Sequence, residues 1–181
     1  MFKVEAITPL IGAEISGVSL NKDLSSETLE KIYNALIKHQ VIFFREQNLT
    51  PESHLKLANC LGDIDPGHPV YPHVEGFQSI TLLKNDGNIR PDTNDWHKDL
   101  TFKSKPPFAS ILHGVSVPEV GGDTLWASMS AAYDSLTDGW KKDLEGLEAI
   151  HDMGTFRNNF YREGGINSVN SALKEVGSAT H

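Results

Sequence analysis

Cysteine, basic residues and long apolar runs are all scarce in this sequence of 181 residues. The single cysteine, Cys60, excludes an intrachain disulfide and a metal site built from several thiolates. Its neighbours along the chain are largely apolar, so we expect its side chain to be buried. Sixteen Lys and Arg against 24 Asp and Glu give a net charge of −8. That balance argues against nonspecific binding to nucleic acid or to an anionic membrane surface.

No apolar run approaches the roughly 20 residues of a membrane-spanning helix. The N-terminus, MFKVE, lacks the apolar core of a signal peptide. A cytoplasmic location is therefore expected. The chain length and a content of 39% hydrophobic residues are typical of one folded domain, and we expect a single domain over residues 1–181.

Two helices are predicted in the N-terminal third of the chain. A capping Ser25 or Ser26 precedes apolar residues spaced as on one helical face, and this helix ends near His39. The residues that this face should bury are Leu29, Ile32, Tyr33, Leu36 and Ile37. The second helix starts at the Thr50-Pro51 pair and runs to Leu61.

Strands are predicted through the middle of the chain. Runs rich in β-branched and aromatic residues predict strands in short pieces over 4–15, and at 41–44, 79–83, 108–117 and 123–126, with further helices near 130–136 and 138–147. The segments 67–76 and 85–94 are predicted to be loops, and the second is a candidate lid. This order of elements favours a mainly β fold with added helices, either a β-sandwich or a jelly roll.

A histidine and a carboxylate stand two positions apart in the run WHKDLTF at 96–102. Side chains two apart on an extended segment point to the same side, so His97 and Asp99 can reach one metal ion. The pair has the form of two of the three groups of a 2-His-1-carboxylate site for Fe(II). The alternative is a surface turn with a chance histidine. We expect Trp96 and Phe102 to pack around the site and shield it.

Five segments together resemble the taurine dioxygenase family of Fe(II)- and 2-oxoglutarate-dependent oxygenases, in the order and at about the spacing of that family. They are ISGV at 15–18, HQVIFFR at 39–45, HPVYPH at 68–73, DWHKD at 95–99 and GGDTLW at 121–126. The resemblance implies a double-stranded β-helix (jelly roll) core, here without its C-terminal strands. It implies a dioxygenase that uses Fe(II), 2-oxoglutarate and O₂ and releases succinate and CO₂. The implied substrate is a small anionic compound, a taurine-like sulfonate or a related organic acid.

The resemblance also implies roles for residues around the metal. Thr124 matches a residue that contacts 2-oxoglutarate, the alternative being a threonine that merely suits a strand. His68 and Tyr71 match residues that hold the sulfonate of the substrate, the alternative being that they only pack within their loop. Thr93 and Phe156 match residues of the substrate pocket. The taurine enzyme has asparagine at the position of Thr93, so a different sulfonate, a sulfate ester or another small acid fits as well as taurine.

Members of the family carry a second metal histidine and an arginine for 2-oxoglutarate in a region that this sequence does not reach. The resemblance therefore covers about the first two-thirds of a member. Apart from the terminal His181, His151 is the downstream candidate for a substitute ligand, and we expect it to be structural. The alternative function is a catalytically incompetent jelly-roll module that binds a small anion without turnover. Unpaired sheet edges would favour homo-oligomers.

Overall fold

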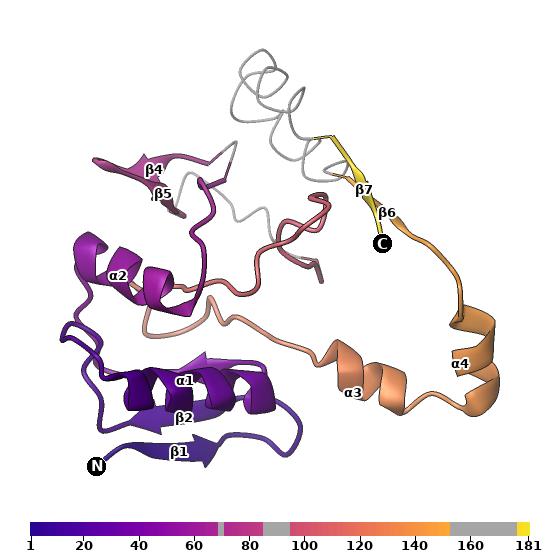
Figure 1. Cartoon of the computed structure of the whole chain (residues 1–181), viewed down its shortest axis with the longest axis horizontal. Helices are drawn as coiled ribbons and strands as arrows, with labels where there is room; N and C mark the ends of the chain where they lie inside the picture. Colours follow the sequence, from indigo (N-terminus) through magenta and orange to yellow (C-terminus); the bar gives the residue numbers. More distant parts are fainter. Residues whose placement is uncertain (69–70, 85–94, 153–176) are drawn as a thin grey trace. The chain divides into compact units, whose positions relative to one another are not determined.

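The computed structural model describes residues 1–68, 71–84, 95–152 and 177–181 (Figure 1). These residues form two compact units. The first unit comprises residues 1–63 and 111–145. The second comprises residues 64–110 and 146–181, so the chain leaves the first unit once and later returns to it before completing the second.

A three-stranded sheet in the order β1-β2-β3 begins the first unit. β1 (Lys3–Ala6) pairs antiparallel with β2 (Ala13–Ser16), and the turn between them is closed by a 2.9 Å hydrogen bond from the amide of Ile7 to the carbonyl of Gly12. β3 (Ile42–Phe43) pairs in parallel with β2, which requires a crossover connection, and helix α1 provides it. Figure 1 shows α1 lying along this sheet. All three strands overlap segments predicted to be strands.

Helix α1 (Ser26–His39) begins and ends where the sequence predicts. The hydroxyl of Ser25 accepts a hydrogen bond from the amide three residues later at 3.2 Å and so caps the first turn. The buried face is narrower than the apolar pattern predicts. Ile32 is buried, whereas Tyr33 and Ile37 are exposed, because neighbouring elements cover the helix only on the side of Ile32.

Helix α2 (Pro51–Leu61) also matches its prediction. The side chains of Thr50 and Ser53 each accept a hydrogen bond from the backbone amide of the other, which is a capping box. Cys60 is exposed, so the expectation of a buried thiol was wrong. The reason is that α2 buries only a narrow stripe around Leu57, and Cys60 lies outside it.

The core of the first unit is small and draws on both long helices, β3 and the loops between them. Its buried members are Leu20, Ile32 and Leu57. Partly buried apolar residues that pack against them are Phe2, Val18, Leu24, Ile42, Phe44, Leu49, Leu61 and Ile111. Since the last of these lies far along the sequence, the core also holds the returning segment of the chain in place.

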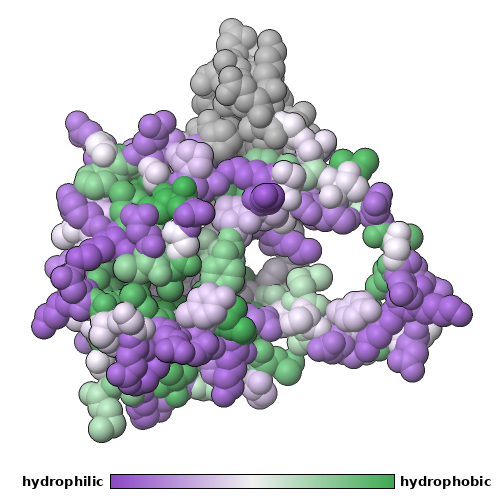
Figure 2. All heavy atoms as spheres, viewed as in Figure 1, coloured by the Kyte–Doolittle hydropathy of each residue, from purple (hydrophilic) through white to green (hydrophobic). Residues whose placement is uncertain are grey.

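The segments 108–117 and 123–126 do not form the two predicted strands. A strand needs a neighbouring strand to complete its hydrogen-bond ladder, and no part of the chain that the structure describes pairs with these segments in that way. Their apolar side chains are highly exposed, with Leu112 at 68%, Val115 at 85% and Leu125 at 72%. Figure 2 shows apolar residues, in green, at the surface among hydrophilic ones.

Two short helices complete the first unit, α3 (Met129–Asp134) and α4 (Asp138–Leu144), and both confirm predicted helices. Each is capped by the hydroxyl of the residue just before it. The side-chain amide of Gln40, at the end of α1, donates to the hydroxyl of Ser130 in α3 at 2.9 Å. None of the helices within the described ranges has the length and apolar composition needed to cross a membrane.

The second unit contains two small antiparallel sheets among its described residues. β4 (His73–Val74) pairs with β5 (Phe77–Thr81), so the strand predicted at 79–83 starts and ends two residues earlier. β6 (Ile150–His151) pairs with β7 (Ala179–Thr180). The mainly β jelly roll expected from the sequence is therefore not formed by the described residues, whose helices contain more residues than their strands.

Candidate metal and substrate site

His97 and Asp99 lie together in the second unit as a shared metal ion would require. The Nε2 of His97 and the Oδ1 of Asp99 are 3.4 Å apart, and both side chains are more than half exposed. Imidazole nitrogens and carboxylate oxygens bind a divalent metal such as Zn²⁺ at about 2.1 Å, so one ion can reach both atoms. Trp96 to Lys98 have no regular secondary structure, and a turn begins at Asp99. Leu100, which follows Asp99, has a left-handed φ of 53°.

The hydrogen bonding of His97 fits a metal. Its Nδ1 lies 3.0 Å from the backbone carbonyl oxygen of Asp95, and because a carbonyl only accepts, Nδ1 carries the proton. The neutral ring then has its lone pair on Nε2, which faces the carboxylate of Asp99. Two acceptor atoms attract each other only through a cation between them, either a proton or a metal ion. The backbone carbonyl also fixes the ring orientation, as is usual for metal-binding histidines.

A third protein ligand is not present in the described part of the chain, where no group of three or more His, Cys, Asp or Glu side chains could hold a metal ion. His151 instead places its Nδ1 2.8 Å from the hydroxyl of Thr101. His181 places its Nε2 2.8 Å from the carbonyl oxygen of the same threonine. The two rings are perpendicular, with centroids 5.3 Å apart. Both histidines therefore hold Thr101 in place, which is a structural role.

The aromatic residues on either side of the pair differ in exposure. Phe102 is only 8% exposed and packs as expected. Trp96 is 71% exposed, so the prediction that it shields the site was wrong. Trp96 precedes the turn that begins at Asp99 and Phe102 lies within it, so the two rings have different surroundings.

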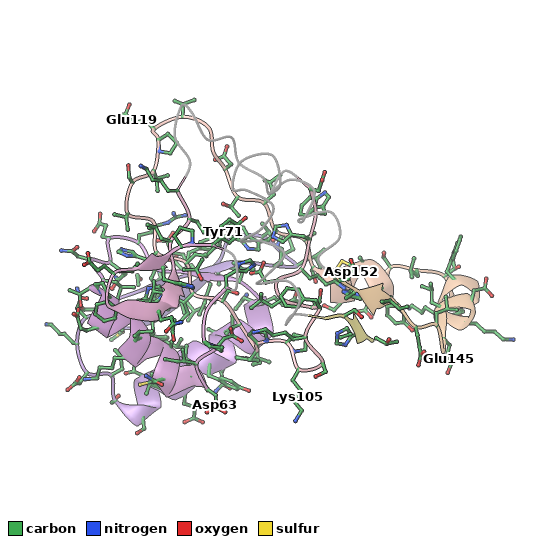
Figure 3. The ribbon with its side chains drawn as sticks, turned by 90° about the horizontal axis from the view of Figure 1, so that it is seen from above. Asp63, Tyr71, Lys105, Glu119, Glu145 and Asp152 are labelled. Carbon is green, nitrogen blue, oxygen red and sulfur yellow. The ribbon has the colours of Figure 1, made fainter. Side chains whose placement is uncertain are left out.

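His68 and Tyr71, the residues predicted to hold the substrate, lie against each other with ring centroids 4.7 Å apart. The amide of Tyr71, which is labelled in Figure 3, donates to Nδ1 of His68 at 3.3 Å. Because Nδ1 accepts, the neutral ring carries its proton on Nε2, where it can donate to an anionic oxygen. The amide of His68 donates to the hydroxyl of Thr81 at 3.2 Å, which anchors this loop to β5.

An ion pair without any signal in the sequence links the loop before His68 to the chain that follows Asp99. The Nζ of Lys103 lies 2.5 Å from the Oδ2 of Asp65, and both side chains are only about one-quarter exposed. The Oδ1 of Asp65 accepts a hydrogen bond from the amide of Gly67 at 3.2 Å. Residues this far apart in the chain have no characteristic spacing, so sequence inspection could not have paired them.

Gly67 lets the backbone beside His68 lie close to the carbonyl of Gln78. Replacing Gly67 with alanine should therefore destabilise the second unit. Gly67 and Gly76 both have left-handed φ angles, 100° and 76°, which cost alanine about 1–2 kcal/mol. A Cβ on Gly67 would lie only 2.5 Å from the carbonyl oxygen of Gln78, whereas a Cβ on Gly76 meets nothing within 4 Å.

The matched pair separates backbone strain from steric overlap. Gly67→Ala should lower the free energy of unfolding by at least about 1 kcal/mol more than Gly76→Ala, because overpacking adds to the same backbone cost. Urea unfolding of the two variants measures the difference. Equal losses would show that the loop around Gly67 adapts without cost.

Two further histidines pack together in the first unit. The Nε2 of His54 lies 3.2 Å from the carbonyl oxygen of Ile111, and the ring of His54 is 6.4 Å from that of His113, between centroids. Burial lowers the pKa of His54 and the nearby His113 lowers it further, while the hydrogen bond to the carbonyl opposes both. We assign this pair to the packing of α2 against the segment that starts at Ile111.

The remaining predicted site residues are Thr124, Thr93 and Phe156. Thr124 is an exposed residue of the first unit, in a stretch without helix or strand. It follows the turn that carries Glu119, which Figure 3 shows at the tip of a projecting loop. Thr93 and Phe156 lie outside the described residues. The candidate lid at 85–94 also lies outside them.

The sequence from residue 3 to residue 179 matches the model of the taurine catabolism dioxygenase TauD, TfdA family. The chain belongs to this family. The resemblance seen in the five segments, which include both residues of the metal pair, is thereby confirmed.

This member of the TauD, TfdA family is similar to several proteins whose names refer to sulfate esters or taurine. A *Pseudomonas putida* protein named alpha-ketoglutarate-dependent sulfate ester dioxygenase is 42% identical over 149 residues, which cover 82% of this chain and 48% of that protein. An *Acinetobacter baylyi* alkylsulfatase is 39% identical over 150 residues, covering 82% and 46%. The crystal structure of a taurine dioxygenase from *Burkholderia xenovorans* is 38% identical with a TM-score of 0.73, covering 83% and 53%. The chain thus spans about half the length of the relatives it matches.

Proposed function

We propose that this chain is part of an Fe(II)- and 2-oxoglutarate-dependent dioxygenase. The observation that carries the proposal is the pair formed by His97 Nε2 and Asp99 Oδ1, two facing acceptor atoms that suit a divalent metal. Family membership supports the use of 2-oxoglutarate, since one relative is named as dependent on alpha-ketoglutarate, which is another name for 2-oxoglutarate. When bound, Fe(II) would support the reaction of O₂ with 2-oxoglutarate that releases succinate and CO₂ and hydroxylates the substrate.

In this proposal, different residues of the chain bind the metal and 2-oxoglutarate. His97 and Asp99 hold the metal from one side, and a third protein ligand comes from outside the described residues. The hydroxyl of Thr124 donates to a carboxylate oxygen of 2-oxoglutarate. In the neutral ring, the contact between His97 Nδ1 and the carbonyl of Asp95 leaves the lone pair on Nε2, the nitrogen that faces Asp99.

The substrate that we propose is a small sulfate ester or sulfonate. The imidazole of His68 and the phenol of Tyr71 supply donors for its anionic oxygens, and Thr93 and Phe156 complete the pocket. One relative is named as a sulfate ester dioxygenase and another as an alkylsulfatase, and Thr93 replaces the asparagine of the taurine enzyme. Both points favour a sulfate ester over taurine. Hydroxylation of the carbon that carries the sulfate would yield a product that releases the sulfate.

We further propose that residues 1–181 belong to one jelly-roll domain. The likeness to the solved taurine dioxygenase supports this, as do the segments 108–117 and 123–126, which have the composition of strands but no ladder partner among the described residues. If no other segment of the protein pairs with 108–117 and 123–126, these exposed segments favour association between copies of the chain into homo-oligomers.

One observation favours a second function, a module that binds a small anion without turnover. The described residues bring together two metal-binding side chains and not three. A module with this incomplete set would keep the donors of His68 and Tyr71 for an anion. Its binding of 2-oxoglutarate would then not depend on Fe(II), which separates the two functions in calorimetry.

An anaerobic titration of the chain with Fe(II) and 2-oxoglutarate tests the proposal. We expect a visible metal-to-ligand charge-transfer band that appears only when both are present. Zn(II) is the matched control, because it should occupy the same ligands but has a filled d shell and gives no such band. Metal-independent binding of 2-oxoglutarate would select the binding module. No binding of metal or 2-oxoglutarate would overturn both functions.

A further inference from the structure

The two oxygens of the Asp99 carboxylate have different neighbours. Oδ1 faces Nε2 of His97 at 3.4 Å, and Oδ2 accepts a hydrogen bond from the hydroxyl of Ser110 at 3.1 Å. Both oxygens are therefore oriented, one towards the imidazole and one away from it. Ser110 lies eleven residues further along the chain but in the same compact unit.

An aspartate in this position needs an external constraint to keep one orientation. Asp99 is 60% exposed at the side chain and stands in a turn, next to the left-handed backbone of Leu100. Packing does not restrict its rotamers as it would in a core. A hydrogen bond from a hydroxyl to a carboxylate is charge-assisted, which makes it generally stronger than a bond between neutral groups.

We propose that Ser110 is a positioning residue that holds Oδ2 of Asp99 and thereby turns Oδ1 towards His97. It does not touch the metal itself. The consequence for metal binding rests on the proposed function, whereas the orientation of Asp99 does not. Mutation of an outer partner, meaning a residue that hydrogen-bonds a metal ligand without touching the metal, commonly weakens metal binding by about 10–100-fold. Because Ser110 is exposed and water competes for the carboxylate, its effect belongs at the lower end of that range.

Three variants of the full chain test the proposal. Ser110→Ala removes the hydroxyl, and Ser110→Thr keeps it. Ser104→Ala is the matched control, an exposed serine of the same unit. Mn(II) affinity is measured by calorimetry, and the χ1 rotamers of Asp99 are measured in the metal-free protein from three-bond NMR couplings.

For Ser110→Ala we expect about tenfold weaker Mn(II) binding and rotamer averaging at Asp99, in line with the loss of an outer partner. Ser110→Thr and Ser104→Ala should stay within about twofold of the parent chain and keep one Asp99 rotamer. Unchanged couplings in Ser110→Ala would overturn the positioning role. If the parent chain binds no Mn(II), the proposed metal site fails, and the couplings alone still decide whether Ser110 orients Asp99.

Discussion

Asp99→Ala should weaken Mn(II) binding by more than about 100-fold, above the range seen for the loss of an outer partner. The substitution removes the carboxylate that faces Nε2 of His97, so His97 remains as the single metal ligand of this pair. The charge-transfer band with Fe(II) and 2-oxoglutarate should disappear in the same variant. Calorimetry with Mn(II) and anaerobic absorption spectroscopy measure the two effects.

Asp63→Ala is the control for this substitution, because it removes one exposed carboxylate and changes the net charge equally. It should bind Mn(II) like the parent chain. Together with Ser110→Ala, the variants should form a graded series in which Asp99→Ala has the largest effect. Mn(II) binding by Asp99→Ala within threefold of the parent chain would place the metal elsewhere in the molecule.

The helices could be predicted because their signals are local. Ser25 and the Thr50-Pro51 pair stand directly before the helices they start, and the bonds that satisfy the first amides lie within three residues. The extent of the buried face could not be predicted in the same way. It depends on which neighbours cover the helix, and Tyr33 is exposed although its spacing fits the apolar face.

The strands at 108–117 and 123–126 were predicted from composition and are absent from the structure. Composition indicates that a segment suits a pleated ladder, but the ladder bonds come from other parts of the chain. Without such a partner the same residues remain irregular and expose their apolar side chains. Local propensity therefore predicted the helical elements better than these two strands.

His97 and Asp99 lie close together, as the spacing of the two residues predicted. His97 and Asp99 were expected to meet because an extended segment places alternate side chains on one side. They do lie 3.4 Å apart, and the turn with a left-handed residue at Leu100 begins only at Asp99. Ser110 and Lys103 had no sequence signal, since their contacts with Asp99 and Asp65 are made by tertiary folding alone.

The largest loss of stability is expected for Ile32→Ala. Ile32 is 1% exposed and lies in the buried cluster with Leu20 and Leu57, in a first unit whose core has few fully buried residues. Truncation to alanine removes three carbons from a packed site and leaves a cavity, which typically costs about 2–5 kcal/mol. Urea unfolding should show this loss as a lower midpoint with an unchanged slope.

Ile37→Ala provides a matched control on the same helix, with the same change of residue and a parent side chain that is 55% exposed. It should change the free energy of unfolding by no more than about 0.5 kcal/mol. A loss comparable to that of Ile32→Ala would mean that the outer face of α1 is covered in solution. If that loss also depended on protein concentration, the cover would be a second copy of the chain, as the homo-oligomer expectation requires.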